Sequence, residues 1–260
     1  MILRDVLHAE WTKLRTLVGT GWLLVAVVVL TTGLSVAAAA ATECRGTGCG
    51  LDAAKVSLTG ITVGQAVVVI LAVLTVSGEY GTGMVHVTFA AMPRRATVLA
   101  AKALVVSGLV VVAGTVAVLT SVLAGRFILP GNGFTVAHGY RALSLADGPV
   151  LRAAAGSVLY LVLIGLLSLG VAAAVRDAAA AIGVVLGLLY LFPIVITVVG
   201  DPDWYRRLRQ IAPMNAGLSV QATVDLGSLP LSPWAGLGVL TVWAAGGMLA
   251  GGLVLRLRDA

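Results

Sequence analysis

The chain has 260 residues, of which 59% are hydrophobic and only 11% are charged, with a formal net charge of +6. A soluble domain carries about 25% charged residues, so this composition excludes an ordinary soluble protein. The basic residues are scattered through the connections and form no patch interleaved with aromatic side chains, which argues against a nucleic-acid partner.

Residues 1–18 are predicted to form an amphipathic helix in the membrane interface, because apolar side chains recur there at helical spacing. Trp11, Lys13 and Arg15 are residue types typical of the headgroup zone. The alternative is an ordinary charged flank. A cleaved signal peptide is disfavoured, since the following apolar run is longer than the roughly 7–15 residues of a signal core.

Six runs of at least 22 residues contain no Asp, Glu, Lys or Arg. An α-helix needs roughly 20 residues to cross a ~30 Å hydrocarbon core, and backbone polar groups in lipid must be bonded internally. We therefore predict an all-α, multi-pass protein of the lipid bilayer, with residues 1–260 forming one domain. The six spans are predicted at about 21–42, 56–78, 99–124, 153–175, 178–199 and 234–255.

The two cysteines lie in the connection after the first span, separated by four residues. The glycines between Cys44 and Cys49 permit the tight turn that a disulfide requires. Two independent thiols are the equally open alternative. A metal site is disfavoured, because two thiols without nearby histidines are not a ligand set.

A polar segment follows the second span. Glu79 stands at the edge of that span, and residues 82–92 are predicted to form a short helix that ends before Pro93. Arg94 and Arg95 come next. A short helix in this position could transmit a push from a soluble partner.

Small residues and one proline mark the later spans. Pro193 is predicted to kink the fifth span. The pairs Gly183/Gly187 and Gly247/Gly251 place small residues on one helical face, where another helix could pack closely. In a chain with 32 glycines, such pairs also arise by chance.

The distribution of Lys and Arg does not decide the orientation. With a cytoplasmic N-terminus and six spans, nine of these residues lie inside and eight outside. Arg206, Arg207 and Arg209 create this near-tie. They lie beside Trp204 and Tyr205, in a segment predicted to be amphipathic and interfacial.

The sequence lacks the motifs of common catalytic sites. It contains no Gly-x-x-x-x-Gly-Lys-Ser/Thr phosphate loop, no His-Glu-x-x-His pair and no Gly-x-Ser-x-Gly elbow. No ionisable residue is expected deep within a span, which disfavours an ion-coupled transporter. We therefore predict that the chain is not an enzyme and that any energy for its function comes from another chain.

Two segments resemble the permease subunits of the ABC-2 class of ABC transporters, especially small permeases of high-GC Gram-positive bacteria. One is Glu10-Trp11-Thr12-Lys13-Leu14-Arg15-Thr16 before the first span. The other runs from Gly78-Glu79-Tyr80-Gly81-Thr82-Gly83-Met84 through Pro93-Arg94-Arg95 to Ala101-Lys102-Ala103.

The resemblance implies an exporter subunit of the bacterial cytoplasmic membrane with both termini in the cytoplasm. Separate ABC ATPase subunits would bind ATP and Mg, so this chain needs no cofactor of its own. A second permease copy or a related permease would complete the complex. The resemblance assigns ATPase coupling to Glu79, Tyr80, Gly83, Met84, Arg94 and Arg95.

The apolar spans favour a hydrophobic or amphipathic cargo, such as a drug, a peptide or a lipid. Two alternatives remain at this stage. One is a non-transporting scaffold or immunity protein with the same fold. The other is a membrane-embedded enzyme, which the missing motifs disfavour.

Overall fold

The computed structural model describes residues 2–16, 18–44, 49–81, 95–140, 142–198 and 201–257. Every regular element in these ranges is helical, which confirms the all-α prediction. Six helices are long and apolar enough to cross a membrane, as expected for a multi-pass membrane protein. They cover Val18–Ala41, Ile61–Gly78, Ala96–Asn132, Gly148–Val175, Ala178–Val198 and Pro233–Leu257.

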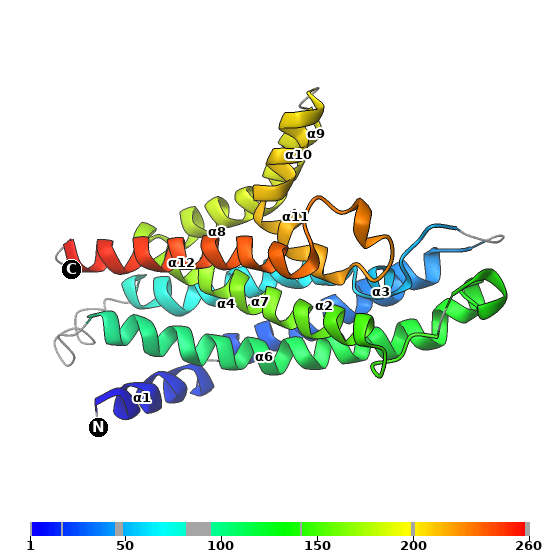
Figure 1. Ribbon diagram of the computed structural model, residues 1–260. Coiled ribbons are helices and arrows are strands. Elements are labelled where there is room, and N and C mark those ends of the chain that lie inside the picture. The colour runs from blue at the N-terminus through cyan, green and yellow to red at the C-terminus, as the bar shows by residue number, and fades with distance from the viewer. Residues whose placement is uncertain are drawn as a thin grey trace.

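Helix α7 (Gly148–Val175) forms the centre of the bundle. It packs against α4 (Ile61–Gly81), α6 (Arg95–Ile128) and α12 (Pro233–Leu257). Helix α2 (Val18–Ala41) covers α4 and α6. Both chain termini lie at one end of the bundle, and the short helix α3 lies at the other (Figure 1).

Two of the predicted small residues allow α7 and α12 to cross closely. A Cβ atom added at Gly170 of α7 would collide with the backbone of Gly247, and one at Gly251 would press on the carbonyl of Gly170. Packing of this kind brings helix backbones together in membrane proteins. The other predicted pair behaves differently, because a Cβ atom added at Gly183 would meet no side chain or neighbouring helix of the described chain within 4 Å.

Hydroxyl groups join helices whose surfaces are otherwise apolar. The hydroxyls of Thr32 on α2 and Thr120 on α6 lie 2.7 Å apart. Ser35 Oγ accepts a hydrogen bond of 3.1 Å from the backbone N–H of Gly60, just before α4 begins. The helix α3 (Ala53–Ser57) and a turn precede α4, so the predicted second span starts later than its charge-free run.

The fifth predicted span is bent, as Pro193 indicates. Helix α8 (Ala178–Leu186) continues into a π-helical turn, Gly187–Leu191, and then into α9 (Phe192–Val198). Proline has no N–H, and its ring crowds the carbonyl of the residue four positions earlier, so the wider turn relieves the clash at the kink. Helix α9 points away from the bundle (Figure 1).

The chain returns from α9 to α12 through two short α-helices and two 3-10 turns, Ser219–Gln221 and Leu226–Ser228. Helix α10 (Pro202–Ile211) contains the predicted interfacial segment and runs back beside α9. Helix α11 (Pro213–Leu218) then packs against α7 and α12 (Figure 1). The helical form of the segment is therefore observed, whereas its place at a membrane surface stays a prediction.

The N-terminal segment forms helix α1 (Ile2–Thr16), which packs on α6. Among the side chains of α1 from Val6 onward, the buried ones are Val6, Glu10 and Leu14, which share one face because they are four residues apart. Trp11, a residue type typical of the headgroup zone, is 48% exposed. The face that contacts the bundle thus contains a carboxylate, which the apolar pattern did not predict.

Candidate functional site

The segment assigned to ATPase coupling lies between α4 and α6 in the sequence, and α4 ends and α6 begins at the end of the bundle that carries both termini (Figure 1). Glu79 and Tyr80 lie in the last turn of α4, and Arg95 is the first residue of α6. Their side chains lie outside the described part of the chain, as do Gly83, Met84 and Arg94 entirely. The structure thus places the two ends of the segment and leaves its contacts untested.

A buried ion pair lies close to this segment. The Nζ atom of Lys102 on α6 is 2.7 Å from Oε2 of Glu10 on α1. Their side chains are only 7% and 4% exposed. The same ammonium donates a hydrogen bond of 3.2 Å to the carbonyl oxygen of Thr75 on α4, so one cation connects three helices.

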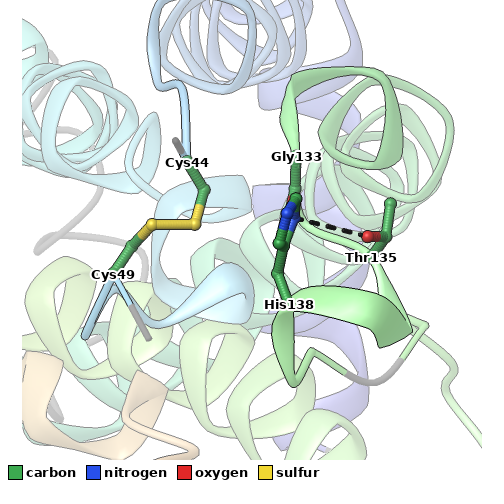
Figure 2. Close-up of a disulfide and its surroundings, with 5 residues drawn as sticks. All are labelled: Cys44, Cys49, Gly133, Thr135 and His138. Atoms are coloured by element: carbon green, nitrogen blue, oxygen red, sulfur yellow. Dashed lines mark hydrogen bonds between the residues drawn. A yellow bond between two sulfur atoms is a disulfide. The ribbon is translucent and has the colours of Figure 1, made fainter. Parts of the chain in front are cut away.

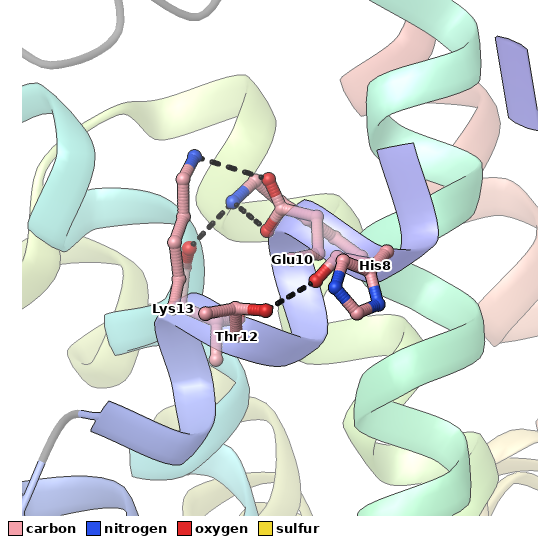
Figure 3. Close-up of polar contacts among 6 residues, drawn as sticks. His8, Glu10, Thr12 and Lys13 are labelled. Atoms are coloured by element: carbon pink, nitrogen blue, oxygen red, sulfur yellow. Dashed lines mark hydrogen bonds and ion pairs between the residues drawn. The ribbon is translucent and has the colours of Figure 1, made fainter. Parts of the chain in front are cut away.

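The second carboxylate oxygen of Glu10 is also occupied. Lys13 Nζ lies 3.3 Å from Glu10 Oε1, one turn further along α1 (Figure 3). On the outer side of the same helix, Thr12 Oγ1 donates to the carbonyl oxygen of His8 at 2.8 Å (Figure 3). Both oxygens of Glu10 therefore face ammonium groups, which is what a buried carboxylate requires.

The expectation that no ionisable residue lies deep within a span stays a prediction, because Lys102 is only the eighth residue of α6. The charge-free run begins at Ala103, but α6 begins at Arg95 and carries Lys102 inside it. Lys102 is tolerated there because Glu10 and the Thr75 carbonyl satisfy its ammonium. Glu10 lies four residues after Val6 and four before Leu14, and this spacing was the sequence signal that could have revealed its buried position.

The three residues predicted to mark the headgroup zone divide between two faces of α1. Lys13 joins the ion-pair cluster with Glu10. Trp11 and Arg15 are exposed and line a groove beside α2. The structure brings these two residues together with Trp22, which sequence reasoning did not single out.

The opposite end of the bundle contains the two cysteines, which form a disulfide with Cα atoms 5.8 Å apart (Figure 2). The backbone N–H of Cys44 donates to the carbonyl of Asn132, at 2.8 Å. Asn132 Nδ2 in turn donates to the carbonyl of Ala39 at the end of α2, at 2.8 Å. Close by, the ring Nδ1 of His138 lies 2.7 Å from the carbonyl oxygen of Gly133 (Figure 2).

Asp52 forms a second set of contacts that join loops at this end of the bundle, and the sequence analysis did not single it out. Its Oδ1 accepts hydrogen bonds from the N–H groups of Ala54 and Lys55, which caps α3. The same carboxylate accepts from the hydroxyl of Thr223 at 2.7 Å and from the N–H of Val224 at 3.3 Å. It therefore joins the connection after the first span to the one before the last span.

The bundle core contains hydrogen-bonded polar groups on three helices. Gln65 on α4 accepts a hydrogen bond from the hydroxyl of Tyr160 on α7, and its amide nitrogen lies 3.4 Å from the sulfur of Met214 on α11. Gln65 and Tyr160 are fully buried. Among the described residues, no three His, Cys, Asp or Glu side chains come together as metal ligands.

Comparison with known proteins finds no family model that matches the chain and no curated protein with significant similarity to it. The resemblance to ABC-2 permeases therefore rests on the two motif segments and on the six predicted spans.

Proposed function

We propose that the chain is the membrane-spanning permease subunit of an ATP-driven exporter of the ABC-2 class. The observation that supports this most is a contact between the two family-like segments. Glu10 belongs to the first segment, Lys102 lies at the end of the second, and the two form the buried ion pair. The two segments that resemble ABC-2 permeases are therefore in contact with each other through this ion pair.

The ion pair gives the proposed coupling segment, Glu79 to Arg95, a route into the bundle. Lys102 lies about two turns after Arg95, and Thr75 lies less than two turns before Gly81. A push on the segment would move α4 and α6 together, and Glu10 would transfer that movement to α1. ATP and Mg would be bound by the separate ATPase subunit that supplies the push.

A second copy or a related permease completes the transport path in this proposal. The path lies between the two permeases, where apolar spans suit a hydrophobic or amphipathic cargo such as a drug, a peptide or a lipid. With both termini in the cytoplasm of a bacterium, the Cys44–Cys49 disulfide lies outside the cytoplasmic membrane. Disulfides persist in such an oxidising compartment.

The first test is purification of the tagged chain in a mild detergent, with identification of the proteins that accompany it. We expect a stoichiometric ATPase that contains a phosphate loop. Its absence, repeated under gentle crosslinking, would favour the non-transporting scaffold or immunity protein and remove the coupling role from the segment between α4 and α6.

The coupling residues are tested by transport assays in vesicles. We expect Glu79→Ala, and separately Gly83→Val, to reduce ATP-dependent transport by at least about fivefold, the lower range of allosteric coupling. The amount of inserted protein should not change. Asp203→Ala is the matched control, because Asp203 is an exposed carboxylate on α10. Normal transport by both variants would contradict the assignment.

A further inference from the structure

A groove of about 540 Å³ lies between α1, α2 and α6, where α1 is followed by α2. Its lining includes Trp11, Leu14 and Arg15 from α1, Trp22 and Val25 from α2, and Leu109 from α6. Trp11 and Trp22 are 48% and 69% exposed. Both indole rings are therefore accessible to a molecule that occupies the groove.

Arg15 is the charged residue of the groove lining, and it has no hydrogen bond or ion pair within the described part of the chain. Helix α1 also contributes to the ion-pair cluster, which consists of Glu10, Lys13 and Lys102. Both oxygens of Glu10 face the two lysines. Arg15 is thus left without a carboxylate among them, and a guanidinium in this state suits an anionic group such as a phosphate.

The groove also has a direction relative to the membrane. Arg15 is the last charged residue before the uncharged stretch from Thr16 to Thr42, so it lies at the membrane boundary. Val25 and Leu109 lie further along α2 and α6, towards the middle of the bundle. The charged mouth is consequently at headgroup level, and the apolar floor is at the level of the acyl chains.

We infer that this groove is a binding site for an anionic phospholipid of the leaflet on the side of the termini. The phosphate pairs with Arg15, an acyl chain lies along Trp22, Val25 and Leu109, and Trp11 lies beside the headgroup. Tryptophan at this depth has the apolar body and polar N–H that the interface favours. The site does not depend on the proposed transport, since it needs no ATPase.

The test uses the tryptophans as reporters in the full-length protein. The chain is reconstituted into phosphatidylcholine vesicles that contain phosphatidylglycerol, with brominated acyl chains on one lipid or the other at equal bromine content. Bromine quenches a neighbouring indole. We expect phosphatidylglycerol to be enriched about fivefold at the groove, the factor typical of one basic residue at an anionic surface.

Two sets of variants locate the effect. Arg15→Gln should abolish the preference, whereas Arg256→Gln should retain it. Arg256 is an exposed arginine near the C-terminus and outside the groove. The double variant Trp11→Phe/Trp22→Phe should remove the difference in quenching between the two brominated lipids, because the remaining tryptophans lie elsewhere.

Three outcomes would overturn the inference. Equal quenching of the unmodified protein by the two brominated lipids would show that no anionic lipid is selected. Equal losses in Arg15→Gln and Arg256→Gln would show a general electrostatic effect without a site. Efficient disulfide-linked dimerisation of Trp22→Cys in membranes would assign the groove to a second copy of the chain instead.

Discussion

Lys102 illustrates how a single residue can organise one end of this protein. Its ammonium contacts Glu10 of α1 and the carbonyl of Thr75 on α4, while its own backbone belongs to α6. Burying such a pair adds little net stability, because desolvation offsets the attraction. Removing one partner is costly, since the other charge is left buried alone. The pair therefore specifies which faces of the three helices meet.

At the same scale, we expect Glu10→Ala to lower the free energy of unfolding in detergent by about 3–5 kcal/mol. The double variant Glu10→Leu/Lys102→Met should recover most of this loss, because it removes both buried charges. Thermal unfolding followed by circular dichroism measures both effects. Lys55→Met, at an exposed lysine on α3, is the control. A melting curve for Glu10→Ala like that of the unmodified protein would contradict the prediction.

Residue roles were only partly predictable from the sequence. The residue types of Trp11, Lys13 and Arg15 indicate a membrane surface, but not that Lys13 turns towards Glu10. Glu10 and Lys102 are far apart in sequence, and only the fold brings them together. The spacing of Cys44 and Cys49 permits a bond without requiring one, so their pairing had to come from the structure.

The lipid environment explains why the charge-free runs are helical. The size of the side chains determines which helices cross closely. Long charge-free runs predict spans because lipid offers no partner to an open backbone. Which helices pack closely depends on matched small residues, and within the described residues only one of the two predicted pairs lies at a close helix crossing. Gly170, Gly247 and Gly251 bring α7 and α12 together, whereas a Cβ atom added at Gly183 would meet no side chain or neighbouring helix of the described chain within 4 Å.

The close crossing of α7 and α12 can be tested by adding one methyl group at Gly170. Gly170→Ala would place a Cβ against the backbone of Gly247, which cannot move without separating α7 from α12. We expect a loss of about 1–3 kcal/mol in unfolding free energy, as for other overpacked sites. Gly183→Ala should be neutral or stabilise by up to roughly 1 kcal/mol, because alanine favours a helix over glycine. Equal melting temperatures for the two variants would exclude a special role for the crossing.

Helix boundaries were the least predictable feature of the elements. Helix α6 begins at Arg95, several residues before the charge-free run, because Lys102 finds partners inside the bundle. The second span begins after α3, since the turn before α4 interrupts the helix. In contrast, Pro193 correctly indicates the bend of the fifth span, because its missing N–H acts locally.

For the molecule as a whole, the arrangement of the ends is clear although charge counting leaves their orientation open. Both termini lie at one end of the bundle (Figure 1). The disulfide and the Asp52 contacts lie at the other. One experimentally located point at either end therefore orients the complete chain.

Labelling of single cysteines tests the orientation, in a background where Cys44 and Cys49 are replaced by serine. Gly131 is exposed and has open space around it, so Gly131→Cys is a suitable site near the disulfide end. We expect a membrane-impermeant maleimide to label it in intact cells. Arg256→Cys, near the C-terminus, should react only after permeabilisation. The reverse pattern would place the termini outside the cytoplasm and exclude the proposed contact with an ATPase.

Different interactions hold the helices together at the two ends of the bundle, and this difference affects how the helices could move. A covalent bond and the carboxylate of Asp52 fasten one end, while α1, α4 and α6 meet at the other around one ammonium. Helix α6, with 34 residues, is about 51 Å long and spans this distance. A tilt of about 5° about the disulfide end would therefore displace the beginning of α6 by about 4 Å. In such a tilt the disulfide end would be the pivot, and the end with the Glu10–Lys102 ion pair would move.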